Sequence, residues 1–393
     1  MTRLLILSSD TGEGHNSAAA AIESAAKSAG FLTSIRKPLE ESTRLNRALA
    51  GFYNTLLRRR PQWMRLYFRM IDRIRPNERD FFYSKVRRYI GRFIDEERPD
   101  ILLSVHPMMN HFLQRFIKEE QMGIPCYTFL TDPFPPFWRG WSSPYVDRYF
   151  VATDEALQAL TASGIPAWRI ERVAMPVRPE FVPATMAEIR QFRAALKMDN
   201  ANVILINGGA RGGGPLLKIY ETIRKASAHS NILVVCGRNT QLRGRIERIQ
   251  DPKTRTFGFV EDVHRYVAAS DIVITKPGAL SAYEALACKV PILFTGLRYL
   301  MPQESGMFQA AEHYDFGFAA KTFDELEAII RKGAHEWRRK CESISQFYQS
   351  ASAGGSLSSS FRTKTGTASP RRAGAATRAV GDASRRARAA PDS

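Results

Sequence analysis

Twice along this chain, a short apolar segment is followed by a glycine-rich loop and then by a helical pattern. The first apolar segment spans residues 4–8 and its loop spans 10–17, while the second spans 203–206 with its loop at 208–215. A short apolar run bounded by glycines is typical of a buried strand, and strand, loop and helix in this order open a doubly wound parallel sheet. The sequence therefore predicts an α/β protein with two Rossmann-like domains.

Further apolar segments alternate with helical patterns, as expected of parallel sheets. We expect additional strands at residues 101–104, 126–130, 148–151, 232–236, 256–259, 272–275 and 292–294. The length of 393 residues suits two domains. We place the amino-terminal domain at residues 1–177 and the carboxyl-terminal domain at 178–350. We expect ligands to bind in the cleft between them, at the carboxyl ends of the strands.

The chain is strongly basic, with 57 Lys and Arg residues against 39 Asp and Glu and a net charge of +18. Residues 44–98 contain fifteen basic and six acidic residues, a net of +9, and residues 351–393 contain eight and two, a net of +6. The rest of the chain is nearly balanced. An excess of this kind favours an anionic partner, which could be nucleic acid, a phosphorylated small molecule or an anionic membrane.

Residues 351–393 are rich in Ala, Ser, Gly, Thr and Arg and poor in apolar side chains. Such a composition cannot bury enough apolar surface to offset the entropy lost on ordering, so we predict a disordered basic tail. The tail could tether the protein to nucleic acid or lipid headgroups, or it could be a solvated extension without a role.

The basic segment at residues 44–98 also carries apolar side chains at helical spacing. They form three stripes, which are Leu45, Leu49, Phe52 and Leu56; Trp63, Leu66, Met70 and Ile74; and Phe82, Val86, Tyr89 and Phe93. Arg65, Arg69 and Arg73 recur every four residues, and an anionic surface would relieve their mutual repulsion. The segment therefore predicts helices that bind an anionic membrane, with the alternative that the stripes face the protein core.

The sequence also predicts where the protein resides. No apolar stretch approaches the ~18 residues that span a bilayer, and the apolar run at residues 4–7 is too short for the core of a signal peptide. The four cysteines are scattered singly, which fits a reducing compartment. We therefore expect a cytoplasmic protein that binds peripherally to the inner face of the cell membrane.

Two glycine-rich loops have features suited to an anionic ligand. The loop at residues 10–17 presents a helix amino terminus, and His15 is either a catalytic residue facing the cleft or a capping residue. The loop at 208–215 has five glycines in eight positions and adds the positive charge of Arg211. It lacks the Lys-Ser/Thr ending of a P-loop, which disfavours nucleoside triphosphate hydrolysis.

A third loop, at residues 275–285, ends a strand with a Pro-Gly turn and opens a helix. Ser281 lies in the first turn of that helix, and Glu284 lies one turn further on. A helix amino terminus with a hydroxyl suits a diphosphate, and a carboxylate suits the paired hydroxyls of a ribose. Phe259 could pack against a base, while the amide and carboxylate at residues 303–304 suit sugar hydroxyls.

Several motifs occur together in a fixed order. They are S-D-T-G-x-G-H at residues 9–15, S-V-H-P-M-M at 104–109, T-D at 131–132, the glycine loop at 208–215, T-K-P-G and E-A-L-A within 275–287, and P-Q-E-S-G at 302–306. This set resembles the monogalactosyldiacylglycerol synthase family and the related peptidoglycan lipid-intermediate N-acetylglucosaminyltransferases. The resemblance implies the GT-B architecture, in which two Rossmann-like domains face a cleft. It also implies inverting, metal-independent transfer of a hexose from a UDP-sugar to a lipid acceptor such as diacylglycerol, with no cofactor.

The resemblance assigns roles by motif position. Glu284 would bind the ribose, Phe259 and Val260 the uracil, Gly212, Gly213, Gly278 and Ser281 the diphosphate, and Gln303 and Glu304 the hexose. The complete implied donor site is Gly14, Arg211, Gly212, Gly213, Phe259, Val260, Lys276, Pro277, Gly278, Ser281, Glu284, Gln303 and Glu304. Helix amino termini, with Arg211 or Lys276, would stabilise the charge of the departing UDP.

An inverting transfer needs a base that deprotonates the acceptor hydroxyl. Asp132, at the carboxyl end of a strand, and His15 are the candidates. His15 could instead stabilise the diphosphate, and Asp132 could simply form a turn before Pro133.

The chain departs from the family pattern in two places. Met307 stands where an asparagine is usual, and the loop at residues 133–141 lacks the usual histidine. This loop contains Phe134, Trp138 and Trp141 instead, and we predict that it contacts lipid.

The predicted partners are therefore a UDP-sugar, a lipid acceptor and an anionic membrane surface. One alternative is a UDP-GlcNAc-dependent transferase that acts on another lipid intermediate. A more remote alternative is a basic nucleic-acid-binding protein, which would carry basic and aromatic residues along one groove. We do not expect nucleic acid to be the partner, because the glycine-rich motifs lie in the nearly neutral part of the chain.

Overall fold

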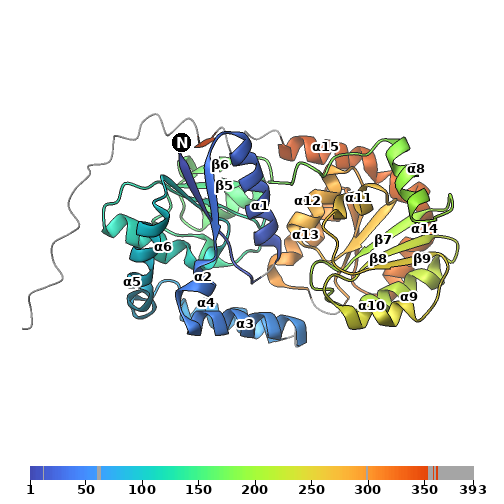
Figure 1. Cartoon of the computed structure of the whole chain (residues 1–393), viewed down its shortest axis with the longest axis horizontal. Coiled ribbons are helices and arrows are strands. Elements are labelled where there is room, and N and C mark those ends of the chain that lie inside the picture. Colours follow the sequence, from blue (N-terminus) through green and yellow to red (C-terminus); the bar gives the residue numbers. More distant parts are fainter. Residues whose placement is uncertain (12, 60–62, 298–299, 353–356, 358–359, 362–393) are drawn as a thin grey trace, which may run out of the picture.

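The computed structural model describes residues 1–393 with the exception of 12, 60–62, 298–299, 353–356, 358–359 and 362–393. Figure 1 shows two lobes side by side, and each contains one six-stranded parallel sheet with helices on its faces. The predicted pair of doubly wound, Rossmann-like domains is confirmed.

The first lobe has the strand order β2-β1-β3-β4-β5-β6. Its strands are β1 (Arg3–Leu7), β2 (Leu32–Arg36), β3 (Ile101–Ser104), β4 (Cys126–Phe129), β5 (Arg148–Val151) and β6 (Ile170–Arg172). Its helices are α1 (Glu13–Ser28), α2 (Pro38–Ser42), α3 (Arg44–Arg59), α4 (Met64–Ile74), α5 (Asp80–Glu97), α6 (Pro107–Glu119), η2 (Arg139–Trp141), α7 (Asp154–Ala162) and η3 (Ala167–Arg169). The strand order reverses between β1 and β3, which is where ligands bind in such sheets.

The second lobe repeats this plan with the strand order β12-β11-β10-β7-β8-β9. Its strands are β7 (Val203–Asn207), β8 (Asn231–Val235), β9 (Thr254–Phe257), β10 (Ile272–Thr275), β11 (Ile292–Thr295) and β12 (Gly317–Ala320). Its helices are α8 (Met186–Ala195), α9 (Leu216–Ala226), α10 (Thr240–Glu247), α11 (Val263–Ala268), α12 (Ala279–Ala287), α13 (Pro302–His313), α14 (Phe323–Arg338) and α15 (Lys340–Ser352). The reversal here lies between β7 and β10.

The predicted strands are all present, with small differences at their ends. The sequence analysis missed β2, β6 and β12, and each of these is an edge strand. An edge strand has one hydrogen-bonded neighbour and needs no continuous apolar run. In β2 every residue is partly or fully exposed, so no such run marks it.

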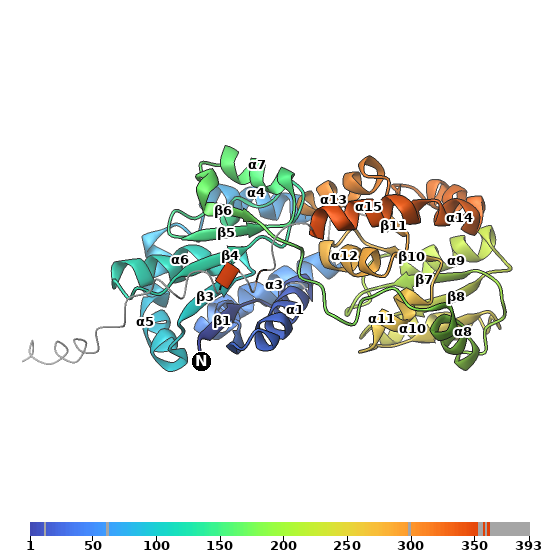
Figure 2. The same ribbon diagram turned by 90° about the horizontal axis from the view of Figure 1, so that it is seen from above.

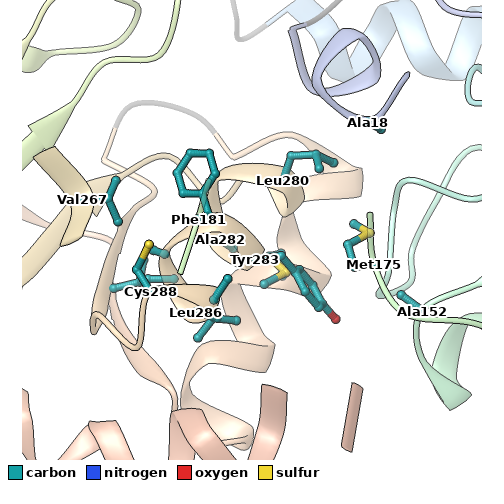
Figure 3. Packing of buried hydrophobic residues seen from close by; sticks show 14 of the residues in the cluster. Ala18, Ala152, Met175, Phe181, Val267, Leu280, Ala282, Tyr283, Leu286 and Cys288 are labelled. Carbon is teal, nitrogen blue, oxygen red and sulfur yellow. The ribbon is translucent and has the colours of Figure 1, made fainter. Parts of the chain in front are cut away.

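One apolar cluster joins the two lobes. Leu280 and Tyr283 of α12 belong to the same buried cluster as Ala18, Ala152 and Met175, which come from the first lobe and the segment that follows β6 (Figure 3). Helix α1 packs directly against α12. Because this cluster draws side chains from both lobes, its burial favours this arrangement of the lobes.

The chain returns to the first lobe near its carboxyl end. Arg172 of β6 donates a hydrogen bond to the main-chain oxygen of Ser350 in α15, at 3.0 Å. Phe361 is 1% exposed and packs against Tyr127 and Phe150 of the first sheet. In Figure 2, a short red segment from this late part of the chain lies over the first lobe. The predicted disordered tail from residue 351 therefore does not hold for Phe361, because the first lobe offers it an apolar pocket. The remainder of the predicted tail lies almost wholly outside the described residues.

Candidate functional site

The predicted loops of the two lobes meet where the carboxyl ends of the strands face one another. Arg211, in the glycine loop after β7, donates a hydrogen bond across the interface to the main-chain oxygen of Asp10, at 3.0 Å. The positive charge of Lys276, which follows β10 in the second lobe, lowers the pKa of His15 in α1 of the first lobe. The structure therefore brings both candidate bases together with Arg211 and Lys276, from two of the loops that we predict to bind the donor.

His15 is held in a defined protonation state. Its Nδ1 atom lies 2.8 Å from the main-chain oxygen of Val105 and 3.2 Å from the hydroxyl of Thr131. Because a carbonyl oxygen can only accept, Nδ1 carries the proton and Nε2 keeps its lone pair. Burial lowers the pKa of His15 to about 4, and the charge of Lys276 lowers it further. At neutral pH the ring is therefore uncharged, with Nε2 as an acceptor.

A second histidine, His106, supports the first, and the sequence analysis assigned it no role. Its ring lies edge-on to His15, with 4.7 Å between centroids, and its Nε2 lies 2.8 Å from the hydroxyl of Thr11. Its Nδ1 accepts from the main-chain N–H of Met108 at 3.4 Å and so caps α6. Burial lowers the pKa of His106 well below the ordinary value. A histidine between a strand and the Pro107 that opens a helix was the available signal.

Asp132 follows β4 and lies at the same edge of the sheet. Its Oδ2 atom accepts a hydrogen bond of 2.9 Å from the indole N–H of Trp141. Burial raises the pKa of Asp132 to about 6, the indole N–H lowers it, and the charge of Glu304 raises it. A carboxylate whose pKa lies near neutrality is better suited to general base catalysis than one with an ordinary pKa.

The glycine loop after β7 is shaped by packing on one side and open on the other. Gly212 has a φ of +59°, and a Cβ atom there would lie 2.0 Å from the main-chain oxygen of Cys236. Gly213 is exposed, and a Cβ atom there would meet nothing within 4 Å. The fold therefore explains the glycine at 212, while the backbone at 213 is accessible to a ligand.

The loop after β10 carries a charged pair. Lys276 donates to Glu304 at the start of α13, with 2.9 Å between Nζ and Oε1. The charge of Glu304 raises the pKa of Lys276. Gly278 caps α12 with extended backbone, and Ser281 lies in the first turn of that helix, as predicted. A lysine beside a helix amino terminus gives this edge positive character.

The residues next to this pair are also near the cleft-facing edge. Pro277 is buried, Gln303 in the first turn of α13 is half-buried, and Gly14 in the first turn of α1 is exposed. A Cβ atom at Gly14 would meet nothing within 4 Å. The roles of these residues in donor binding remain predictions.

Glu284, the predicted ribose ligand, is 9% exposed on α12. Its Oε1 atom lies 3.4 Å from a terminal nitrogen of Arg178, in the segment between the lobes. Burial raises the pKa of Glu284 to about 7, although Arg178 opposes the shift. Phe259, the predicted uracil contact, is 48% exposed after β9, where the guanidinium of Arg238 lies 4.4 Å from its ring centroid. Val260 beside it is half-buried.

The predicted lipid contact of the loop at 133–141 is wrong for two of the three aromatic residues that we assigned to it. Trp141 is 0% exposed, and Phe134 is 5% exposed and stacks on Phe347 of α15. Trp138 is half-buried. The loop packs closely against the second lobe at Pro135, since a Cβ atom at Gly306 of α13 would lie 2.3 Å from the main-chain oxygen of that residue.

Helices α3 and α4 do present an exposed apolar surface, and they lie along one edge of the first lobe (Figure 1). We call it the α3–α4 face; its exposed side chains are Leu49, Phe52, Trp63, Leu66, Met70 and Ile74. Arg69 and Arg73 are exposed on α4, while the side chain of Arg65 lies outside the described residues. The third predicted stripe faces the core instead, because Val86 and Phe93 are buried.

Among the described residues, no helix is both long and apolar enough to cross a bilayer. The described part of the chain also contains no group of three or more His, Cys, Asp and Glu side chains arranged to hold a metal ion.

Tyr53 links the α3–α4 face to the interlobe site, and the sequence analysis missed it. It lies on α3 one residue after the exposed Phe52, and its ring centroid is 5.6 Å from that of Tyr67 on α4. Burial raises the pKa of Tyr53, and the charges of Glu304 and Asp132 contribute to the rise. One helix therefore borders both the exposed apolar surface and the candidate base.

Comparison with known proteins agrees with this geometry. Residues 15–177 match the family model for monogalactosyldiacylglycerol (MGDG) synthase, and residues 214–342 match the model for glycosyl transferases group 1. The chain thus combines a region similar to MGDG synthase in the first lobe with a region similar to glycosyl transferases group 1 in the second lobe. Each family model covers one lobe, so the chain combines both parts of the interlobe site.

Proteins similar to this chain occur in plants and bacteria. The chain is 29% identical over 323 residues to the chloroplastic monogalactosyldiacylglycerol synthase of Spinacia oleracea, covering 77% of this chain and 60% of that protein. It is 26% identical over 300 residues to the processive diacylglycerol beta-glucosyltransferase of Bacillus pumilus, covering 74% of this chain and 76% of that protein. The chain thus spans about 60% of the length of the spinach relative.

Solved structures share the fold at low identity. MurG of Acinetobacter baumannii has a TM-score of 0.59 at 14% identity, covering 88% of this chain and 95% of that chain. HepE of Anabaena, solved in complex with UDP and glucose, has a TM-score of 0.58 at 13% identity, covering 93% of this chain and 100% of that chain. These likenesses establish the two-lobed architecture.

Proposed function

We propose that this protein transfers a hexose from a UDP-sugar to the hydroxyl of diacylglycerol at the surface of an anionic membrane. The observation that carries the proposal is the meeting of Asp132, His15 and the donor loops at one interlobe edge, bordered by the α3–α4 face. The names of the spinach and Bacillus relatives support diacylglycerol as the acceptor, and the UDP complex of HepE supports the donor class.

In the proposed reaction, the acceptor hydroxyl gives its proton to the carboxylate of Asp132. The acceptor oxygen then attacks the anomeric carbon of the hexose while the bond from that carbon to the diphosphate oxygen breaks. A single displacement of this kind inverts the anomeric configuration. Asp132 is the favoured base, because its raised pKa lies closer to neutrality than that of His15.

The negative charge that develops on UDP would be stabilised by groups on the second lobe. The amino terminus of α12 presents main-chain N–H groups, and Lys276 and Arg211 supply positive charge next to it. We propose that these groups take the place of a divalent cation and that no cofactor is needed. His15, neutral and accepting at Nε2, would orient a sugar or acceptor hydroxyl.

The α3–α4 face would dock on the bilayer. Its six exposed apolar side chains could enter the interface between headgroups and acyl chains, while Arg69 and Arg73 interact with anionic headgroups. Each basic residue near such a surface contributes about 1 kcal/mol. Tyr53 on the same helix pair borders the candidate base, so docking would place the acceptor hydroxyl close to Asp132. We propose that this occurs on the inner face of the cell membrane.

The proposal is tested with purified protein and vesicles that contain diacylglycerol and an anionic lipid. UDP-galactose, UDP-glucose and UDP-GlcNAc are supplied separately, and the lipid products are identified by mass spectrometry. We expect one hexose to be transferred to diacylglycerol. If UDP binds but no donor gives a glycolipid, the acceptor is wrong, and a UDP-GlcNAc-dependent transferase acting on another lipid becomes the better hypothesis. If UDP does not bind, the donor assignment fails.

A further inference from the structure

Trp141 is a buried aromatic residue in direct contact with the proposed chemistry, and its burial excludes the predicted contact with lipid. Its side chain is 0% exposed, and its indole N–H donates to Oδ2 of Asp132 at 2.9 Å. Its ring also lies against His15, with 6.2 Å between centroids. One side chain therefore contacts both candidate bases.

The loop that ends at Trp141 begins at Asp132, so the indole hydrogen bond closes a ten-residue turn of chain upon itself. The middle of this loop is fixed against the second lobe, where Phe134 stacks on Phe347 and Pro135 approaches Gly306. Trp141 lies at the end of this loop, in η2, and its side chain is held by buried contacts.

We propose that Trp141 is the positioning residue that holds the Asp132 carboxylate in its base form and in a fixed direction for the acceptor hydroxyl. This inference rests on the proposed function. A hydrogen bond from a neutral donor stabilises the ionised carboxylate relative to the protonated acid. The second oxygen, Oδ1, would then be the atom that receives the acceptor proton.

The surroundings of Asp132 make this single donor important. Glu304 of α13 raises the pKa of Asp132, and Lys276 is engaged with Glu304. The other titratable or charged groups around the site are His15 and His106, which burial keeps neutral near pH 7, and Tyr53 of α3, whose phenol is neutral at that pH. Arg211 of the glycine loop donates to the main-chain oxygen of Asp10. The described neighbours thus offer burial and a like charge, both of which disfavour ionisation, and the indole N–H opposes them.

The test is the pH dependence of kcat/KM for hexose transfer by Trp141→Phe, which removes the N–H but keeps an aromatic ring. In the wild type, kcat/KM should decrease on the acid side of the profile with a midpoint near the Asp132 pKa of about 6. Without the hydrogen bond the pKa of Asp132 rises, so this midpoint should move to higher pH by about one unit. On the acid side kcat/KM should fall about tenfold and recover at alkaline pH.

Trp337→Phe is the matched control. Trp337 is also 0% exposed, and its indole N–H donates to the main-chain oxygen of Ile329 in α14, away from the interlobe site. This control should keep the wild-type pH profile even where it lowers stability. If Trp141→Phe folds poorly, replacement of Trp141 by benzothienylalanine preserves the ring shape and removes only the donor.

The outcomes are distinct. An acid-side midpoint that shifts in the Trp141 variants alone supports the proposal. A superimposable profile, or a loss of kcat/KM that is uniform across pH, overturns it while leaving the transferase function intact. If the wild-type protein itself transfers no hexose, the proposed function has failed and the role of Trp141 falls with it.

Discussion

Replacement of Gly306 by alanine should separate the candidate base from the donor site by a small, calculable distance. A Cβ atom at Gly306 would lie 2.3 Å from the main-chain oxygen of Pro135 and 2.6 Å from that of Phe134. Real Cβ contacts are essentially never shorter than 3.0 Å, so α13 and the loop must move apart by at least 0.7 Å, the difference between 3.0 and 2.3 Å. Both atoms are main chain, and no side chain can rotate away.

The consequence for catalysis follows from that displacement. A misplacement of ~1 Å costs about a hundredfold in rate, and we therefore expect Gly306→Ala to lower kcat by about 10- to 100-fold, which corresponds to ~1.4–2.7 kcal/mol. The clash should also cost ~1–3 kcal/mol of stability. UDP affinity should change little, because the loops predicted to bind UDP lie within the second lobe.

The assay is hexose transfer to diacylglycerol in vesicles, with UDP affinity measured by calorimetry and unfolding followed by circular dichroism. Gly244→Ala in α10 is the control, since a Cβ atom there would meet nothing within 4 Å. A Gly306→Ala protein that keeps wild-type kcat would refute the reasoning that this glycine sets the distance between the lobes.

Three further changes test other parts of the structure. Leu66→Glu with Met70→Glu should reduce co-sedimentation with anionic vesicles at least tenfold, since burying each apolar side chain contributes ~1.5–3 kcal/mol. Met186→Glu, at an even more exposed position on the second lobe, should leave co-sedimentation unchanged, and an equal loss in this control would exclude the α3–α4 face as the membrane contact. UDP affinity should rise between pH 6 and 8 as Glu284 ionises around its pKa of about 7. Glu284→Gln should bind UDP about tenfold more weakly and should lack this rise. If calorimetry shows the same pH dependence of UDP affinity in the variant as in the wild type, the predicted ribose contact is wrong. Phe361→Ala should lower the free energy of unfolding in urea by about 3 kcal/mol, and an unchanged midpoint would show that this residue does not anchor the chain end.

The sequence predicts most of the fold because the central strands of both sheets are buried on two faces. Strands such as β3 and β10 are buried at all four positions, so an apolar run marks them. The edge strands β2 and β6 are partly exposed, and no such run identifies them. A parallel strand can therefore be predicted from the sequence when both of its faces are buried.

The loops that we predict to bind the donor were recognisable as strand-loop-helix junctions because glycines, helix starts and charged residues lie together along the chain. The direction of the aromatic side chains in the loop at 133–141 was not, because the residues that cover Phe134 come from α13 and α15, more than 160 positions away. Tyr53 was missed for the same reason, whereas His106 had a sequence signal in its position between a strand and Pro107. Tyr53 is adjacent to the site only after elements distant in sequence have packed together.

The most direct measurement of the central claim is the anomeric configuration of the glycolipid made from a UDP-α-hexose and diacylglycerol, determined by proton NMR. A single displacement assisted by Asp132 predicts a β-hexosyl diacylglycerol, and Asp132→Asn should form it at less than a hundredth of the wild-type rate. An α-linked product, or an Asp132→Asn protein that retains wild-type activity, would contradict the account.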